Sequence, residues 1–381
     1  MTLPSQRALF EIPREITYLN AAAYVPLPRA VREAGQKGVT TKSFPWDMTT
    51  THGTEISERA RTAAATLLGT AADNVAITGA VSYGIATAAR NLPIARGTRI
   101  LMIEGEFPSL ALVWPQLAEA AGATVEIVPR PANADWTSAI LAAVHRPGAP
   151  PVGLAALTPL HWSDGALIDL AQITPALHRQ GARVVIDATQ STGVLDLDLA
   201  ALKPDFLAFP TYKWVLGPYS LAFLYVAPEH HSGRPLEDHG PARTPGSNSY
   251  IPTARRFDRG EKNDPIGLPM AATGLEQVLA WQPSAVAARL RTLTDALAEA
   301  VADIPGLTML PRALRAPHIL GLRLSAGEHG GGLPPGLIDR LTARGVHVAD
   351  RLGVMRVSPH VYNDETDTAA FATALRTELA A

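Results

Sequence analysis

Cysteine does not occur anywhere in the 381 residues of this chain. Its absence excludes disulfide bonds, thiolate metal sites and a cysteine nucleophile. No uninterrupted apolar run reaches the ~20 residues that a membrane-spanning helix needs. Residues 1–15 also lack the basic and apolar regions of a signal peptide. We therefore expect a cytoplasmic protein that has no membrane partner.

Charge of either sign is in short supply, because charged residues make up only 18% of the chain and the net charge is −2. A chain with this balance has no basic surface for nucleic acid, so no nucleic-acid partner is expected. Lysine is especially scarce: five of the 33 basic residues are lysines, namely Lys37, Lys42, Lys203, Lys213 and Lys262. Each lysine can therefore be considered separately for a chemical role.

Short β-branched runs alternate with alanine-rich segments of helical period from about residue 75 to residue 226. The alternation predicts an α/β fold with a mostly parallel sheet sandwiched by helices, in which ligands bind beyond the carboxyl ends of the strands. The expected strands are 75–78, 99–104, 124–128, 152–158, 183–187, 205–209 and 221–226. The expected helices between them are 82–92, 110–121, 137–144 and 169–180.

The pattern becomes irregular after residue 227. Residues 228–268 are rich in proline, glycine and charge and are too long for a simple connection. A helical pattern over 270–303, interrupted by Pro283, leads into a region of short strands and helices. We expect a large domain over residues 16–268, and a small α+β domain made of residues 1–15 and 269–381.

Lys213 lies in the apolar and aromatic segment DFLAFPTYKWVLGPYSLAFLYV, between two predicted strands. Burial lowers the pKa of a lysine, and the neutral amine is a nucleophile able to form a Schiff base. The alternative is a lysine at a strand end whose ammonium group extends to solvent. The residue by itself favours this alternative.

Two further segments could form a cofactor site. Asp187 ends a buried strand and is followed by Gln190. The carboxylate of Asp187 suits a cation such as a protonated pyridine. Alternatively, Asp187 could be the N-cap of the next helix or a magnesium ligand. The segment ITGAVS, residues 77–82, predicts a strand, a turn and a helix N-terminus that could bind an anion. As an N-cap alone, Ser82 would need no ligand.

The order of these three segments resembles that of the fold-type-I pyridoxal-phosphate enzymes, and specifically the class V aminotransferase family. This family includes cysteine desulfurases, isopenicillin N epimerase-like proteins and kynureninases. The resemblance covers roughly residues 16 to 375 and includes TYLNAAAYVPLP, EFPSLALVWP and MRVSPHVYND. The most specific segments are VVIDATQSTG and TYKWVLGP.

The resemblance implies a homodimeric enzyme that uses pyridoxal 5'-phosphate and acts at the Cα of an amino acid. Lys213 would hold the cofactor and move the Cα proton, and Asp187 would pair with the pyridinium nitrogen. The other cofactor-binding residues implied are Val81, Ser82, Phe107, Gln190 and Tyr212. Arg356 would bind the substrate carboxylate, and Asn20, His161 and Trp162 are further substrate-binding candidates.

Several departures from the family pattern bear on the reaction. Without cysteine, the persulfide mechanism of the desulfurases cannot operate. Glu261 occupies the place of a threonine through which the partner subunit reaches the phosphate in relatives. The neighbouring histidines His230, His231 and His239 lack the spacing of a metal site, so no metal is expected.

Three function classes remain after this comparison. An enzyme of the aminotransferase type comes first, and a cysteine-independent C–S or β-lyase, a kynureninase-like hydrolase or an epimerase are alternatives to it. A catalytically inactive binding protein of the same fold is a second class. A nucleotide-binding α/β protein is a third, which is disfavoured because the Walker and GxGxxG phosphate-loop patterns are absent.

Overall fold

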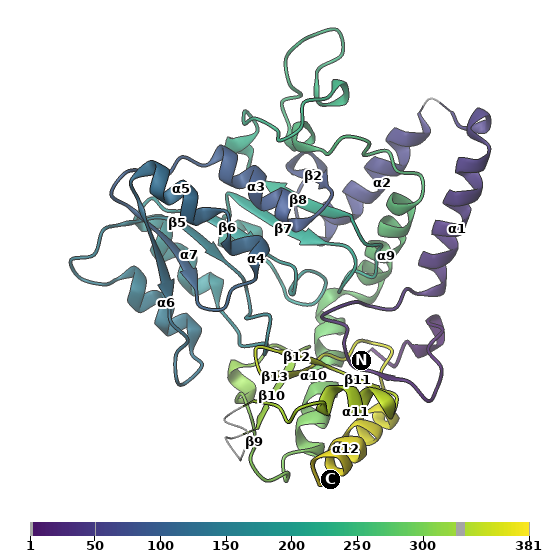
Figure 1. The fold of residues 1–381 in the computed structure, drawn as a ribbon. Helices are drawn as coiled ribbons and strands as arrows, with labels where there is room; N and C mark the ends of the chain where they lie inside the picture. Colours follow the sequence, from purple (N-terminus) through teal and green to yellow (C-terminus); the bar gives the residue numbers. More distant parts are fainter. Residues whose placement is uncertain (1–2, 50, 325–331, 381) are drawn as a thin grey trace.

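The computed structural model describes residues 3–49, 51–324 and 332–380 of the chain. A large α/β domain forms the upper part of the molecule in Figure 1, and a small domain containing the C-terminal helix lies below it. No helix within these ranges is long and apolar enough to cross a membrane.

The large domain is organised around a seven-stranded sheet with the order β2-β8-β7-β6-β5-β3-β4. Strands β3 to β7 are parallel, whereas β8 is antiparallel to both of its neighbours. Six of the strands are almost fully buried, as expected for a sheet covered on both faces. All seven predicted strands are confirmed to within one residue at each end: β2 (Val75–Thr78), β3 (Arg99–Ile103), β4 (Thr124–Val128), β5 (Val152–Leu157), β6 (Arg183–Asp187), β7 (Phe206–Pro210) and β8 (Ala222–Val226).

Helices cover the two faces of this sheet and bury a separate apolar cluster on each. One cluster involves α2, α6, α7 and α9, and the other involves α3, α4 and α5. Helix α1 lies at the outer edge, against α9 (Figure 1). The bounds are α1 (Arg29–Ser43), α2 (His52–Leu67), α3 (Val81–Asn91), α4 (Pro108–Ala111), α5 (Trp114–Ala121), α6 (Trp136–Val144), α7 (Leu170–Arg179), α8 (Leu199–Leu202) and α9 (Gly267–Trp281).

Prolines divide two of the predicted helices. The expected helix over 110–121 is two helices, α4 and α5, because Pro115 occupies the first turn of α5 and cannot continue a preceding helix. The pattern over 270–303 is likewise divided into α9 and α10 (Pro283–Ala300). Gln282 joins the latter two with a φ of 67°, which is outside the helical range.

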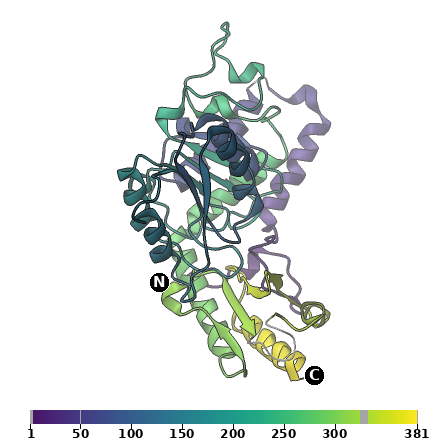
Figure 2. The same cartoon turned by 60° about the vertical axis from the view of Figure 1, so that its left-hand side comes forward.

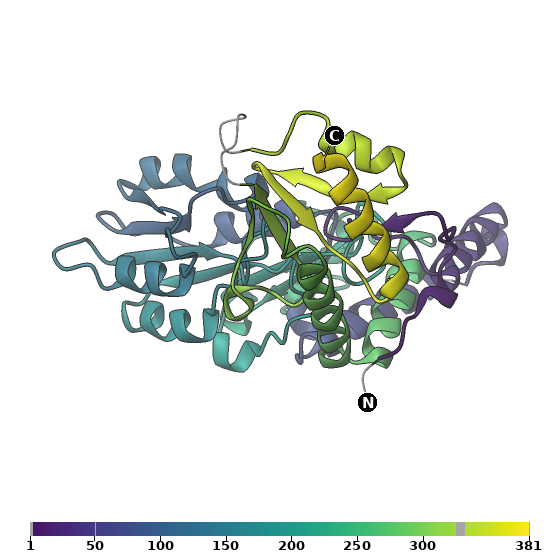
Figure 3. The same cartoon turned by 90° about the horizontal axis from the view of Figure 1, so that it is seen from below.

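The small domain contains a four-stranded antiparallel sheet with the order β12-β13-β10-β9. Its strands are β9 (Leu307–Met309), β10 (Leu320–Leu324), β12 (Ala349–Arg351) and β13 (Val354–Val357), and its helices are α10, α11 (Leu337–Ala343) and α12 (Glu365–Ala380). Figure 2 shows the chain passing from the large domain into the small domain through α10. Figure 3 shows the small domain from below, with its C-terminal helix α12 in yellow.

The N-terminal residues pack on the small domain, and this packing extends beyond residue 15, where the predicted boundary falls. Strand β1 (Thr17–Tyr18) pairs in parallel with β11 (Val346–His347). Arg7 forms an ion pair of 3.1 Å with the buried Asp367 of α12. The boundary at residue 268 stays a prediction, and the packing of α9 against α1 and α2 leads us to propose a division at Gln282 instead.

Residues 228–266 form three short 3₁₀ turns, Pro228–His230, Gly240–Ala242 and Ala254–Phe257, joined by irregular chain that leads into α9. Part of this segment projects from the top of the large domain in Figure 1. Its base is fixed by the buried Asp258, whose carboxylate accepts hydrogen bonds from Arg61 at 2.8 and 2.9 Å.

Candidate active site

A cavity of about 410 Å³ lies at the carboxyl ends of the central strands, where the small domain meets the large one. Nine of the eleven predicted site residues line it, namely Val81, Ser82, Phe107, Trp162, Asp187, Gln190, Tyr212, Lys213 and Arg356. These residues come from segments up to 275 positions apart in the chain. The cavity is therefore the structural counterpart of the site that the sequence predicts.

Lys213 projects into the cavity from the loop that connects β7 to β8. The loop is held in shape by Thr211, whose hydroxyl donates to the carbonyl oxygens of Pro218 at 2.5 Å and Leu221 at 3.1 Å. The lysine is 8% exposed, and burial together with the nearby Arg356 lowers its pKa to about 7, although Asp187 acts in the opposite direction. A neutral, nucleophilic amine is therefore available near neutral pH.

Asp187 is the last residue of β6 and lies beside β7, which precedes Lys213. One carboxylate oxygen accepts a hydrogen bond from the Thr189 N–H at 2.8 Å. Burial raises the pKa of Asp187, while the bonds from Thr189 and the charge of Lys213 lower it. A protonated ring nitrogen in the cavity would compensate the cost of burying this carboxylate.

The part of the cavity lined by the start of α3 is suited to a phosphate. Gly79 to Ser82 form the turn into α3, whose N-cap, Ala80, has no capping side chain. The first N–H groups of a helix have no intrahelical acceptors and attract anions. Arg259 places a positive charge near this turn. Its Nη1 lies next to Gly79 and donates a hydrogen bond to the carbonyl oxygen of Ser220 at 3.0 Å.

These features fit pyridoxal 5'-phosphate: an amine to bind its aldehyde, a carboxylate for its ring nitrogen and a helix N-terminus for its phosphate. When bound, the cofactor supplies an electron-withdrawing ring that stabilises negative charge at the substrate Cα. Phe107, at the start of α4, offers a ring face and meets Trp162 edge to face with 5.4 Å between the centroids.

Gln190 is held in place by its own hydrogen bonds. Its amide nitrogen donates to the carbonyl oxygen of Ala22 at 3.0 Å, and its amide oxygen accepts from the indole of Trp214 at 2.8 Å. The predicted contact of Gln190 with the phenolic oxygen of the cofactor stays a prediction.

Arg356 reaches the cavity from strand β13 of the small domain. It is 2% exposed, and its Nη1 donates a hydrogen bond to the carbonyl oxygen of Trp162 at 2.9 Å. Burial, and secondarily the charge of Arg351, lower its pKa to about 9. A carboxylate in the cavity would relieve both effects, as expected for a site that binds the α-carboxylate of an amino acid.

Asn20 and His161 are not among the described residues that line the cavity. Asn20 forms an isolated bridge with Ser358. His161 is buried, with its ring stacked on that of Trp136 at 5.6 Å and its Nδ1 2.8 Å from the Ser163 hydroxyl. Burial, assisted by Arg130, lowers the pKa of His161 to about 4, so it is neutral at pH 7. Its predicted contact with substrate finds no support in this position.

Two further charged residues, Glu106 and Arg351, line the cavity and were not predicted from the sequence. Oε1 of Glu106 accepts a hydrogen bond from the Phe107 N–H at 2.7 Å, whereas Oε2 is buried and has no partner among the described residues. Burial raises the pKa of Glu106 to about 8. Glu106 directly precedes the predicted site residue Phe107, and Arg351 lies five residues before Arg356. These positions in the sequence could have indicated that both side chains lie near the cavity.

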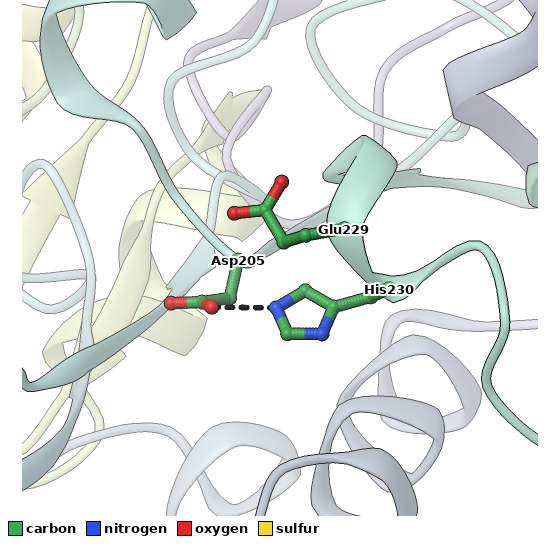
Figure 4. Close-up of side chains that lie close together, drawn as sticks. All are labelled: Asp205, Glu229 and His230. Carbon is green, nitrogen blue, oxygen red and sulfur yellow. Dashed lines mark hydrogen bonds and ion pairs between the residues drawn. The ribbon is translucent and has the colours of Figure 1, made fainter.

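A cluster of possible metal ligands lies elsewhere, at Asp205, Glu229 and His230 (Figure 4). The Asp205 oxygens already accept hydrogen bonds from His230 at 2.6 Å, Arg183 at 3.0 Å and the Val184 N–H at 2.7 Å. An arginine on the same carboxylate would repel a cation. These contacts connect the start of β7 to its neighbours, and we assign no metal to them.

Fold and site together define a pyridoxal-phosphate-dependent enzyme that acts on an amino acid. The family model described as aminotransferase class-V matches residues 17–371, and the chain belongs to that family.

Similar proteins differ in the reactions their names describe. An isopenicillin N epimerase from Amycolatopsis lactamdurans is 28% identical, with 95% of this chain and 94% of the relative covered. A probable hercynylcysteine sulfoxide lyase from Mycobacterium tuberculosis is 30% identical over 50% of this chain and 48% of its own. A solved structure of the cystine C-S lyase C-DES with its product cysteine persulfide shares the fold, with a TM-score of 0.84, 20% identity, and coverage of 95% and 97% of the two chains.

Proposed function

We propose that the enzyme is an aminotransferase, in which Lys213 transfers a proton between the substrate Cα and the cofactor. The observation that carries the proposal is the buried amine of Lys213 in the cavity. Arg356 lowers the pKa of this amine and Asp187 raises it. Transamination needs one group to remove a proton and return it to another carbon, and Lys213 can perform both steps.

Each cavity residue has a part in this reaction. Arg356 binds the α-carboxylate and so directs Cα toward Lys213. Asp187 keeps the ring nitrogen protonated, and the first turn of α3 with Arg259 holds the phosphate. Phe107 and Trp162 shield the reacting end from water, which strengthens these electrostatic contacts.

A cysteine-independent β-lyase is the second candidate function. The half-chain similarity to a probable hercynylcysteine sulfoxide lyase favours it. Elimination needs no base besides Lys213 when the leaving group at Cβ is good. The aromatic lining from Phe107, Trp162 and Tyr212 suits a larger or sulfur-bearing side chain.

The reaction type can be tested by incubating the holoenzyme with L-amino acids and no keto-acid acceptor. A single turnover that bleaches the cofactor absorbance, restored by added keto acid, supports the aminotransferase. Sustained release of pyruvate or another β-cleavage product identifies a lyase. Accumulation of the D-isomer without either change identifies an epimerase, and both of these results contradict the proposal.

We also propose that the enzyme is a homodimer whose interface adjoins the cavity. Tyr24 and Tyr219 are 57% and 62% exposed and pack together at its rim, with centroids 5.8 Å apart. Exposed aromatic clusters of this kind mark surfaces that bind another chain. The projecting part of 228–268 supplies a further surface (Figure 1). Sedimentation of wild-type and Tyr219→Asp protein tests this, and a monomer active at high dilution would contradict it.

A further inference from the structure

Two arginines of the small domain, Arg351 and Arg356, line the same cavity. The proposed function uses only one of them, Arg356, for the α-carboxylate of the substrate. The role of Arg351 is therefore open, and its position gives three independent indications of what it binds.

The first indication is the register of the small sheet. Strands β12 and β13 pair so that Arg351 lies opposite Val354, and Ala349 lies opposite Arg356. Cross-strand partners share a face, and residues two apart along a strand do too. Arg351 and Arg356 are therefore diagonal neighbours on one face, separated by roughly 7–8 Å at the backbone.

The second indication is the turn that follows Arg351. Leu352 and Gly353 have φ values of 55° and 74°, and the Gly353 N–H donates to the Asp350 carboxylate at 3.0 Å. Positive φ at both central residues is typical of a two-residue turn that closes a hairpin, so the turn fixes the pairing of β12 with β13. The Leu352 side chain approaches Gly105 of the large domain, so the turn lies against the other wall of the site.

The third indication is the balance of charge. Among the described residues, the one hydrogen bond of the Arg351 side chain goes from Nη1 to the Asp350 carbonyl oxygen at 2.7 Å. Asp187 would pair with the cofactor ring, and burial raises the pKa of Glu106, the other cavity acid, to about 8, so that it holds its proton near neutral pH. The charge of Arg351 also contributes to lowering the pKa of both Lys213 and Arg356, as expected for a cation close to both groups.

We propose that Arg351 binds a second anionic group of the substrate, a carboxylate on its side chain, so that the substrate is an acidic amino acid. This inference rests on the proposed function, because it assumes that Arg356 takes the α-carboxylate. The diagonal pair of guanidinium groups then holds the two ends of one molecule, and each can bind a carboxylate through two parallel hydrogen bonds.

The test is a set of binding titrations of the holoenzyme, followed by the cofactor absorbance. L-Aspartate and L-glutamate are compared with their amides, L-asparagine and L-glutamine, which match them in size but lack the second charge. We expect at least one acid to bind wild-type enzyme on the order of tenfold more tightly than its amide. Arg351→Gln should abolish this preference by weakening the acids far more than the amides.

Three further variants distinguish a site for the side-chain carboxylate from a general effect of positive charge on the cavity. Arg351→Lys should keep part of the preference, because the charge remains and the bidentate geometry is lost. Arg356→Gln should weaken acids and amides alike. Arg312→Gln removes an exposed arginine of the small domain and should change nothing.

The outcomes also separate this inference from the proposed function. Equal binding of acids and amides by wild-type enzyme overturns the role of Arg351 and leaves the proposed function intact. Equal weakening of both by Arg351→Gln means that Arg351 binds the α-carboxylate, and likewise overturns it. If no amino acid perturbs the cofactor absorbance, the proposed function fails and this inference fails with it.

Discussion

Arg356 and Trp162 join the two domains at the cavity, through a hydrogen bond of 2.9 Å from Nη1 of the arginine to the carbonyl oxygen of the tryptophan. The residues are 194 positions apart in the chain. Nε of the same guanidinium is buried without a partner among the described residues. The arginine is thus held by one nitrogen and retains donors for a ligand.

Arg356→Gln should therefore lose affinity for every amino acid, by ~2–5 kcal/mol, because a desolvated ion pair with the α-carboxylate is removed. Titration of the holoenzyme, followed by the cofactor absorbance, measures the loss. Arg356→Lys should recover part of it, because the charge is kept. Unchanged affinity in the glutamine variant would exclude this role for Arg356.

Lys213→Ala should fold, bind the cofactor without a covalent bond and show no turnover. Borohydride reduction followed by peptide mapping should find the cofactor attached to Lys213 in wild type and to no lysine in the variant. Lys203→Ala, at an exposed lysine of the same domain, is the matched control. A cofactor bond to another lysine would disprove the assignment.

The rate of cofactor attachment should depend on pH in a defined direction. The neutral amine of Lys213 is the nucleophile, and burial lowers its pKa to about 7. The neutral fraction therefore grows as the pH rises through 7, and the attachment rate of apo protein should rise over that interval. A rate that increases only near pH 10 would show that the lysine is not desolvated.

Asp187→Asn should retain much of its cofactor affinity and lose most of its catalytic rate. The amide cannot keep the ring nitrogen protonated, so negative charge at Cα is less well stabilised. Stopped-flow measurement of Cα deprotonation, with a deuterated substrate to identify the step, separates this effect from binding. Turnover at the wild-type rate would refute the pairing.

Glu106→Gln should stabilise the apo protein more strongly as the pH rises. Burial raises the native pKa of Glu106 to about 8 from an ordinary value of 4.5. Between these values the native state holds a proton that the unfolded chain has released, so the free energy of unfolding of wild type falls by up to about 1.4 kcal/mol per pH unit. Glutamine does not titrate and escapes this loss.

Urea unfolding of apo wild type and Glu106→Gln at pH 5 and pH 8 checks this prediction. The difference in the free energy of unfolding between the two proteins should be larger at pH 8. Glu119→Gln, at an exposed glutamate of α5, should show the same difference at both pH values. A pH-independent difference for Glu106→Gln would mean that its carboxyl group is ionised in the folded protein.

The sequence alone determined the strands of the large domain and singled out three segments that line the same cavity. Apolar runs of four to six residues, bounded by glycine, proline and polar residues, are local signals, and they define the strands directly. Asp187 ends such a strand, and Lys213 and the turn at Ser82 each follow one. Because ligands bind at the carboxyl ends of parallel strands, their approximate meeting place could be inferred before the strand order was known.

Only the tertiary structure decided which side chains face the cavity. The ring of His161 turns away and stacks on Trp136, whereas Glu106 and Arg351, which the sequence did not single out, line the cavity. The small domain likewise reaches the site through the contact of Arg356 with Trp162. The orientation of a loop side chain depends on packing partners distant in the chain, and local residue patterns contain no information about those partners.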